Sequence, residues 1–256
     1  MEKLNRTAIV ILTWNRLHTL KNTINSFRKY NKINSNDVII VDNGSTDKTP
    51  EFLKNTDYDI ILNKSNMGAQ MGKYIGWNRA FERGYDFILF LEDDHSCYRT
   101  VPILDIEKYL DINKDVGIVR LNDKGYLNRH QITHLPIRYY PRKELNDKFK
   151  IFKCNYHFTS HPSIFRTTLV SKLKGCVLPK YKPKMKKSDI PILGFDKYKK
   201  INLDKYKTAV NRALMNFNRR EKEYMRLYMW SYRLTAQIKP CCFKWVDKKR
   251  MKDWKN

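Results

Sequence analysis

The sequence predicts an α/β fold with a mostly parallel central sheet flanked by helices. Short apolar runs rich in β-branched residues recur four times in the first 100 residues. Segments in which apolar residues recur at helical spacing separate these runs. This alternation is typical of βαβ units, in which right-handed crossovers place parallel strands side by side.

Each apolar run is short enough for one buried strand, and each ends in polar or small residues. The first run, "AIVIL", is followed by Thr13, and the fourth, "YDFILFLE", ends in acidic residues. The four strands are expected at residues 8–12, 37–43, 59–63 and 85–92.

Helices are expected between these strands. Leu17, Leu20, Ile24 and Phe27 recur at helical spacing and predict a helix over about 17–30. A short helix is expected behind "STDKT", and a long helix at 69–83 should end at Gly84.

The second half of the chain has weaker periodicity. Residues 116–122 predict another strand, 157–166 a strand or a loop, and the lysine-rich segment 174–189 a surface loop. Apolar residues at helical spacing over 204–238 predict a helical C-terminal region.

Charge is distributed unevenly along the 256 residues. Residues 1–100 contain 14 Lys and Arg and 12 Asp and Glu, a net charge of +2, whereas the other 156 residues contain 37 and 14, a net of +23. A basic half can attract an anionic partner. Compositional drift in a chain rich in Lys, Asn, Ile and Tyr is the alternative.

The composition excludes two classes of protein. A hydrophobic content of 41% indicates a globular chain rather than a disordered one, and no apolar run approaches the roughly 20 residues of a membrane span. The five cysteines are odd in number and form no CxxC pair, which favours a reducing, cytoplasmic compartment. The N-terminal residues are expected to form a strand rather than a signal peptide.

The acidic cluster Glu92-Asp93-Asp94 directly follows the apolar residues "FILFL". Adjacent like charges are costly unless a cation lies beside them, and Mg²⁺ and Mn²⁺ prefer oxygen ligands. Ligands in open α/β sheets bind beyond the carboxyl ends of the strands. A divalent metal site is therefore expected here, and a solvated acidic turn is the alternative.

Three segments in register resemble glycosyltransferase family 2: "VILTWNR" (10–16), "VDNGSTDKT" (41–49) and "NMGAQMGKYIGWNRAFERGYDFILFLEDD" (66–94). The resemblance implies the Rossmann-like GT-A fold and a nucleotide-sugar donor. It implies a catalytic domain at 1–200, with a nucleotide-sugar-binding half at 1–100 and an acceptor half at 101–200. Residues 201–256 would then form a basic, aromatic-rich helical extension.

The resemblance gives Asp42 the role of recognising the donor base, with Thr13 and Asn15 beside it. A turn shaped by Asp42 and Asn43 is the alternative. Lys73 could reach the diphosphate as a point charge or could be a solvated surface residue. The full set of expected donor-binding residues is Thr13, Asn15, Arg16, Asp42, Asn43, Asn66, Gly68, Lys73, Glu92 and Asp93.

The acidic cluster resembles the family's D-x-D motif, with Glu92 in the first position. By this resemblance Asp93 contacts the ribose and Asp94 ligates Mn²⁺ or Mg²⁺, which bridges the two phosphates of the donor and acts as a Lewis acid. His95 could add a ligand or could orient the acids.

Inverting transfer requires a base that takes the proton of the acceptor hydroxyl. The resemblance places this base roughly ninety to a hundred residues beyond the metal motif, where Asp189 is the first candidate and Asp196 the second. A helix cap is the alternative for Asp189. His157 and His161 could line the acceptor or diphosphate pocket, or could be packing residues.

The predicted function is metal-dependent, inverting transfer of a sugar, with a UDP-sugar first among donors, to a hydroxyl on an acceptor. The basic second half favours an anionic acceptor, such as an acidic glycan or a lipid-linked phosphate. Transfer to hydroxylated bases in DNA is one alternative. A non-catalytic module that binds nucleic acid or membrane is another. The expected location is cytoplasmic, with peripheral binding to an anionic membrane surface left open.

Overall fold

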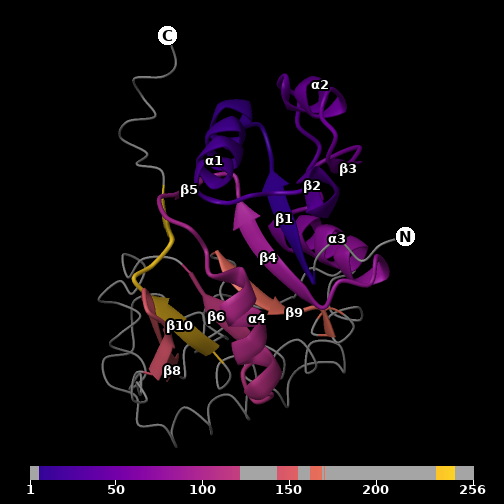
Figure 1. The fold of residues 1–256 in the computed structure, drawn as a ribbon. Helices are drawn as coiled ribbons and strands as arrows, with labels where there is room; N and C mark the ends of the chain where they lie inside the picture. The colour runs from indigo at the N-terminus through magenta and orange to yellow at the C-terminus, as the bar shows by residue number, and fades with distance from the viewer. Residues whose placement is uncertain (1–5, 122–142, 155–161, 169, 171–234, 246–256) are drawn as a thin grey trace, which may run out of the picture.

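The computed structural model of the chain describes residues 6–121, 143–154, 162–168, 170 and 235–245 (Figure 1). The first half alternates strands and helices as expected. Its strands are β1 (Thr7–Thr13), β2 (Val38–Asp42), β3 (Asp59–Leu62) and β4 (Phe87–Glu92). Its helices are α1 (Leu17–Tyr30), the 3₁₀ turn η1 (Ser35–Asp37), α2 (Thr49–Lys54) and α3 (Ala69–Glu82).

The remaining described elements follow β4 in the chain, and five of them extend the sheet beyond β4. They are β5 (His95–Cys97), α4 (Ile103–Ile112), β6 (Ile118–Arg120), β7 (Lys143–Asn146), β8 (Phe149–Cys154), β9 (Ser163–Arg166), β10 (Thr235–Lys239) and β11 (Phe243–Trp245). Nine of the described strands form one sheet in the order β3-β2-β1-β4-β9-β6-β10-β8-β7, and β5 pairs with β11.

The block β3-β2-β1-β4 is entirely parallel, whereas β9 pairs antiparallel with both β4 and β6. The chain runs outward from β1 through β2 to β3 and then returns to place β4 on the other side of β1. Strand order therefore reverses at β1 and β4, which is the kind of position where open α/β sheets bind ligands. The expected α/β fold is confirmed.

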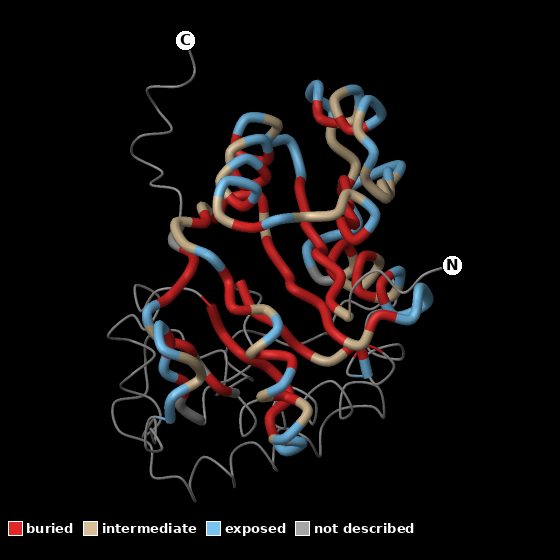
Figure 2. Tube along the Cα trace, viewed as in Figure 1, coloured by how far each residue is buried: buried red, intermediate tan, exposed pale blue. Residues whose placement is uncertain are grey.

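Alternating residues of the strands form two apolar cores. Ile9 and Ile11 of β1 pack with buried residues of α1 and α4 on one face of the sheet. Val10 and Leu12 pack on the other face with Trp77 of α3. Buried residues therefore concentrate along the strands and on the inner sides of the helices (Figure 2). The result is a sheet between two helical layers.

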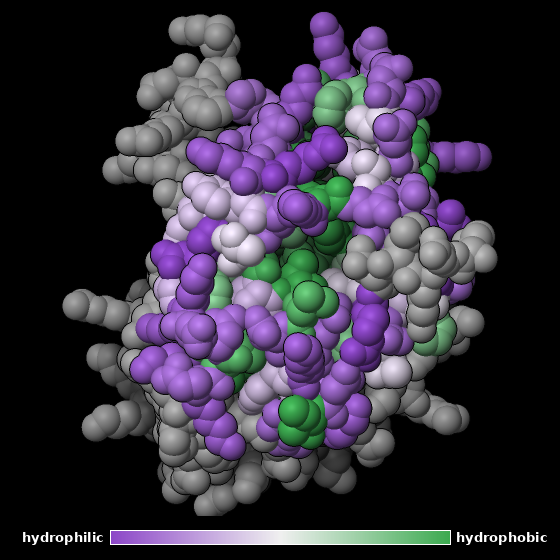
Figure 3. Space-filling model, in the orientation of Figure 1, coloured by the Kyte–Doolittle hydropathy of each residue, from purple (hydrophilic) through white to green (hydrophobic). Residues whose placement is uncertain are grey.

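The outer surface agrees with this layering. Figure 3 shows mainly hydrophilic side chains over the outward sides of α1 and α4, with hydrophobic side chains gathered in the band between them. Among the described residues, none of the helices has the length and apolar character that crossing a membrane requires.

Helix α3 lies unusually close to the sheet because two of its residues are glycines. A Cβ atom on Gly76 would lie 2.6 Å from Val10 Cγ1 and 2.8 Å from Val41 Cγ2, and one on Gly72 would lie 2.7 Å from Leu12 Cδ1. These distances are shorter than real carbon contacts. The missing side chains therefore set the depth at which α3 packs.

The helical prediction for 204–238 is wrong for its last residues. Thr235–Lys239 form β10, which lies between β6 and β8 in the central sheet, and Phe243–Trp245 form β11. Ala236 and Ile238 are buried, and their alternation fits a strand better than a helix. Residues 204–234, the predicted loop 174–189 and residues 157–161 lie outside the described residues. The rest of the predicted strand or loop at 157–166 contains the strand β9.

We predict that Gly76→Ala lowers the free energy of unfolding by about 1–3 kcal/mol, because the added methyl group overpacks the interface between α3 and the sheet. Helix propensity alone would raise it by about 1 kcal/mol, since alanine is the better helix former. Chemical denaturation of both proteins measures the difference. A stabilised variant would show that α3 can move outward at no cost.

Candidate functional site

The candidate site lies at the carboxyl ends of β1 and β4, where strand order reverses. Leu12 of β1 is in register with Glu92 of β4, and the backbone N–H of Asp93 continues the ladder by donating to Leu12 O at 3.1 Å. The loop after β1 and the acidic cluster after β4 are therefore neighbours. The sequence places polar groups at these two ends, and the fold brings them together.

Asp93 points into the protein and accepts hydrogen bonds from the loop after β1. Thr13 Oγ1 donates to Asp93 Oδ2 at 2.9 Å, and the backbone N–H of Trp14 donates to the same oxygen at 3.3 Å. Arg16 Nη1 lies 3.2 Å from Asp93 Oδ1. Burial raises the pKa of Asp93, and Arg16 and the Thr13 hydrogen bond oppose that shift. These contacts fix Asp93 at the base of the site.

Glu92 forms an ion pair with Lys73 of α3, the helix that packs on the face of the sheet opposite α1. Lys73 Nζ lies 2.9 Å from Glu92 Oε1 and 5.8 Å from the centre of the Phe90 ring. Lys73 is 4% exposed. The interpretation of Lys73 as a solvated surface lysine is therefore wrong. Its contact with a donor diphosphate stays a prediction.

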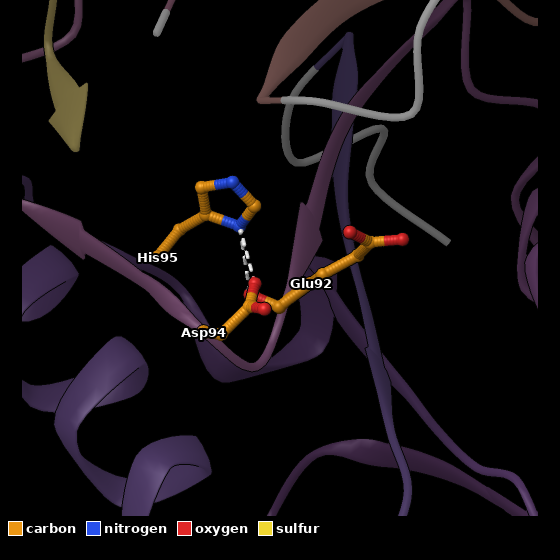
Figure 4. A group of neighbouring side chains, drawn as sticks. All are labelled: Glu92, Asp94 and His95. Atoms are coloured by element: carbon orange, nitrogen blue, oxygen red, sulfur yellow. Dashed lines mark hydrogen bonds and ion pairs between the residues drawn. The ribbon is translucent and has the colours of Figure 1, made fainter. Parts of the chain in front are cut away.

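Asp94 and His95 form a second buried pair (Figure 4). His95 Nδ1 lies 3.2 Å from Asp94 Oδ1, and the side chain of His95 is fully buried. Burial lowers the pKa of His95 to about 3, so the imidazole is neutral at pH 7. A neutral imidazole is the form that ligates a metal.

The turn that carries these residues is fixed to α1. Thr23 Oγ1 lies 3.0 Å from the backbone oxygen of Asp93 and 2.8 Å from that of His95. The strand β5 that follows pairs with β11, so His95 lies opposite Trp245 in the register. The acidic cluster is thus held by a helix on one side and by a strand from the far end of the chain on the other.

Glu92, Asp94 and His95 could hold a metal ion together. Each offers one ligand atom, and these atoms all lie within 4.8 Å of one another. Two carboxylate oxygens and one imidazole nitrogen suit Mn²⁺, which accepts both kinds of ligand, and the oxygens also suit Mg²⁺. The donor set therefore fits the expected metal and adds Glu92 and His95 to Asp94.

Asn43 holds together the loops that follow β2 and β3. Its Nδ2 donates to Asn66 Oδ1 at 3.0 Å and to Gly68 O at 3.3 Å. Its Oδ1 accepts from Asn63 Nδ2 and from the backbone N–H of Met67, both at 3.1 Å. Asn43 is 3% exposed. These contacts give it a clear structural role, and a direct contact with donor stays a prediction.

Asp42 shapes the turn after β2. The backbone N–H of Ser45 donates to Asp42 Oδ1 at 3.3 Å and to Oδ2 at 3.2 Å, and the Ser45 hydroxyl group donates to Oδ1. Asp42 is 1% exposed, and burial raises its pKa although the hydrogen bonds from Ser45 oppose the shift. Asp42 therefore shapes the turn after β2, as the alternative interpretation expected, and base recognition by Asp42 stays a prediction.

Asn15 joins this turn to the loop after β1. Its Oδ1 accepts from the backbone N–H of Thr46 at 2.7 Å, and its own N–H donates to Ser45 Oγ at 2.8 Å. Its φ of 51° lies in the left-handed region, which asparagine tolerates better than most residues. The local contacts of Asn15 therefore explain why an asparagine follows Trp14.

A pocket of about 290 Å³ opens at this edge of the sheet. It is lined by Leu12, Thr13, Trp14, Arg16, Asn43, Asn66, Ala69, Glu92, Asp93 and Asp94. Seven of these are expected donor or metal residues. Trp14 is a lining residue that the sequence analysis did not single out, although its position between Thr13 and Asn15 is a signal. Its side chain is 48% exposed.

Four expected site residues lie outside the described residues: Asp189, Asp196, His157 and His161. Their roles as base or as pocket lining stay predictions. Gly68 precedes α3 with a φ of 82°, and a Cβ there would have no heavy atom within 4 Å. The open space beside this backbone leaves room for a ligand to approach it, and donor binding by Gly68 stays a prediction.

Comparison with known proteins gives a family and a fold. The family model described as glycosyl transferase family 2 matches residues 8–173. No curated protein matches the chain. Among solved structures, TarS 1–349 from S. aureus matches with a TM-score of 0.54 at 13% identity. The match covers 96% of this chain and 62% of the TarS chain. A second TarS structure has a TM-score of 0.50 at 15% identity, and the match covers 85% of this chain and 41% of the TarS chain. The chain thus spans less than two thirds of these proteins, and the similarity shows the fold.

We predict that Lys73→Met lowers the free energy of unfolding on the order of 1–3 kcal/mol, because it leaves the partly buried Glu92 carboxylate beside two other acids without its cation. In the double variant Lys73→Met/Glu92→Gln the loss should be smaller than the sum of the single losses. Urea denaturation of Lys73→Met, Glu92→Gln and the double variant measures these losses. Lys54→Met, at an exposed position of α2, is the control and should change stability by less than about 0.5 kcal/mol. Additive losses would show that the ion pair contributes nothing.

We also predict that Gly44→Ala destabilises the protein more than Gly68→Ala. Both glycines have φ near 80°, which residues with a side chain rarely adopt, so both variants carry backbone strain of roughly 1–3 kcal/mol. A Cβ on Gly44 would also lie 2.4 Å from the backbone carbon of Ser65, which cannot move aside as a side chain can. Thermal unfolding of the two variants compares them directly. Equal losses would show that the loop at Ser65 yields freely.

Proposed function

Because this chain belongs to glycosyltransferase family 2, we propose that it transfers a sugar from a nucleoside-diphosphate sugar to a hydroxyl acceptor in a metal-dependent, inverting reaction. The observation that carries this proposal is the group Glu92, Asp94 and His95 at the reversal of strand order, where Glu92 and Asp94 line the pocket and His95 is buried beside them. Glycosyl transfer itself follows from the family. The metal, the stereochemistry and the acceptor are the parts proposed.

The residues that would hold the metal are Asp94 first, with Glu92 and His95 beside it. A bound Mn²⁺ or Mg²⁺ would supply Lewis acidity toward the phosphate oxygens of the leaving group. The protein prepares this position by keeping His95 neutral and by orienting Asp94 through the 3.2 Å contact with His95. Lys73 holds the Glu92 carboxylate in place at the pocket wall through their 2.9 Å ion pair.

The donor would lie in the pocket with its base near Trp14. The half-exposed indole offers a flat face for stacking a base, which is sequence-tolerant. Asp93 lies deeper, where its carboxylate could accept a hydrogen bond from a ribose hydroxyl. The pocket volume of about 290 Å³ is at the low end for small-molecule sites, so the sugar would extend toward residues 101–200. A UDP-sugar is the first donor to test.

The acceptor hydroxyl must lose a proton as the new bond forms, and a carboxylate near it would act as the base. Asp189 is the proposed base, with Asp196 second. The transition state is proposed to resemble an oxocarbenium ion, as in inverting glycoside hydrolysis. The net charge of +23 on residues 101–256 supports an anionic acceptor. Hydroxylated bases in DNA are a second candidate acceptor for the same reason.

We predict that Asp94→Asn abolishes Mn²⁺-dependent hydrolysis and transfer of a UDP-sugar while the fold persists, because a neutral amide is a poor ligand for a hard dication. In the parent chain, Mn²⁺ with UDP-sugar at about a hundred times its dissociation constant should raise the melting temperature by several degrees. Asp94→Asn should lose this rise.

Asp57→Asn is the matched control, because Asp57 is an exposed acid between α2 and β3 away from the pocket. It should behave as the parent chain does in both assays. Full activity of Asp94→Asn would contradict the assignment of the metal ligand. Absence of any thermal shift with a panel of nucleoside-diphosphate sugars and Mn²⁺ would contradict the proposed function itself.

A further inference from the structure

The contacts between Arg16 and the acidic cluster are longer than the shortest contact in each of the other arginine–carboxylate pairs that the structure describes, which lies between 2.6 and 3.0 Å. Arg16 uses a single nitrogen, Nη1, which lies 3.2 Å from Asp93 Oδ1 and 3.4 Å from Asp94 Oδ2. Strong pairs of this kind are shorter, about 2.7–2.9 Å, and often use two parallel bonds. Arg16 therefore bridges two carboxylates loosely.

Two pairs elsewhere show what a tight contact looks like in the same protein. Arg6 donates to Asp111 through Nη1 at 2.6 Å and through Nη2 at 3.2 Å. Arg79 donates to Asp59 through Nε at 2.9 Å and through Nη2 at 3.3 Å. Both use the planar fork of the guanidinium group, and Arg16 does not. A loose, shared contact is the easier one to displace.

The backbone of Arg16 is fixed, whereas its side chain reaches the cluster from the solvent side. The carbonyl oxygen of Arg16 accepts from the backbone N–H of Leu20 at 2.9 Å and from Thr19 Oγ1 at 3.0 Å at the start of α1. Its side chain is 43% exposed, whereas those of Asp93 and Asp94 are 5% and 12% exposed. The guanidinium group can thus leave while the acids and the helix stay in place.

The charge balance of the site also favours displacement of Arg16. Within the described part of the chain, the carboxylates of Glu92, Asp93 and Asp94 form ion pairs with Lys73 and Arg16. Lys73 is buried below the site, and Arg16 lies at its open side. A dication on Asp94 would share a carboxylate with the Arg16 guanidinium, and the two positive groups would repel each other. Binding of the metal therefore favours departure of Arg16.

We propose that Arg16 is an internal counter-cation that occupies the carboxylates of Asp93 and Asp94 until a divalent metal displaces it. The inference rests on the proposed function, since it concerns the same metal. Once displaced, the guanidinium group remains on the pocket wall, where it faces the diphosphate of the donor. Arg16 then weakens binding of the metal alone and strengthens binding of a nucleoside diphosphate with the metal.

The test measures binding, without turnover, in the full chain. We expect Arg16→Met to bind Mn²⁺ about five- to tenfold more tightly than the parent chain, because the competing cation is gone; this equals about 1–1.4 kcal/mol. Arg16→Lys keeps the charge and should stay within about twofold of the parent. Arg28→Met, which removes a positive charge from the last turn of the same helix, should leave the affinity unchanged. Electron paramagnetic resonance of free Mn²⁺ gives the dissociation constants, and melting temperatures verify that each variant is folded.

A second measurement separates displacement from damage to the site. At saturating Mn²⁺, Arg16→Met should bind UDP several-fold more weakly than the parent, opposite to its effect on the metal. A damaged site would weaken both.

Unchanged or weaker Mn²⁺ binding by Arg16→Met would overturn the inference, as would equally tight binding by Arg16→Lys and Arg16→Met. In both cases the proposed function stands, provided that the parent binds Mn²⁺ and Asp94→Asn does not. Failure of the parent chain to bind Mn²⁺ would overturn the proposed function, and this inference with it.

Discussion

Mutual repulsion among three consecutive carboxylates is the constraint around which this end of the molecule is organised. Glu92 ends β4, whose other residues are apolar and buried, and Asp93 and Asp94 follow it directly, so the three acids cannot separate by moving into solvent without unravelling the strand. The fold instead brings one cation from each helical layer: Lys73 from α3 and Arg16 from the start of α1. The acidic cluster is stable in the protein because the helices on both faces of the sheet deliver these charges.

The electrostatics depend in turn on close packing. Lys73 reaches Glu92 at 2.9 Å from a buried position. That reach depends on the depth of α3, which the missing side chains of Gly72 and Gly76 permit. A helix held farther out by ordinary side chains would leave the ammonium group short of the carboxylate. Two glycines in the middle of a helix, which propensity alone disfavours, thus serve the charge balance of the site.

Local patterns predicted the first half of the fold well, because strand and helix periods are properties of neighbouring residues. The strand ends at Thr13, Asp42 and Glu92 and their meeting at one edge followed from that pattern. The burial of Lys73 could not be predicted, since the partner of a helical lysine depends on how the helix seats on the sheet. The strand Thr235–Lys239 was missed for a related reason. Its five residues continue a helical spacing, and its partners β6 and β8 lie at least 80 residues away in the chain.

The three acids have the same charge but different surroundings, and the surroundings distinguish their roles. Asp93 accepts hydrogen bonds from the protein itself, so it is suited to fixing the loop after β1 and to receiving one further hydroxyl. Asp94 faces a neutral imidazole and a loosely held guanidinium, which leaves it the carboxylate best placed for a metal. Glu92 is already neutralised by Lys73, so it can add an oxygen ligand without adding net negative charge to the site. A dication would therefore meet a site whose charge is divided among distinct positions, and of the two cations described there, Arg16 has the longer contacts with the acids.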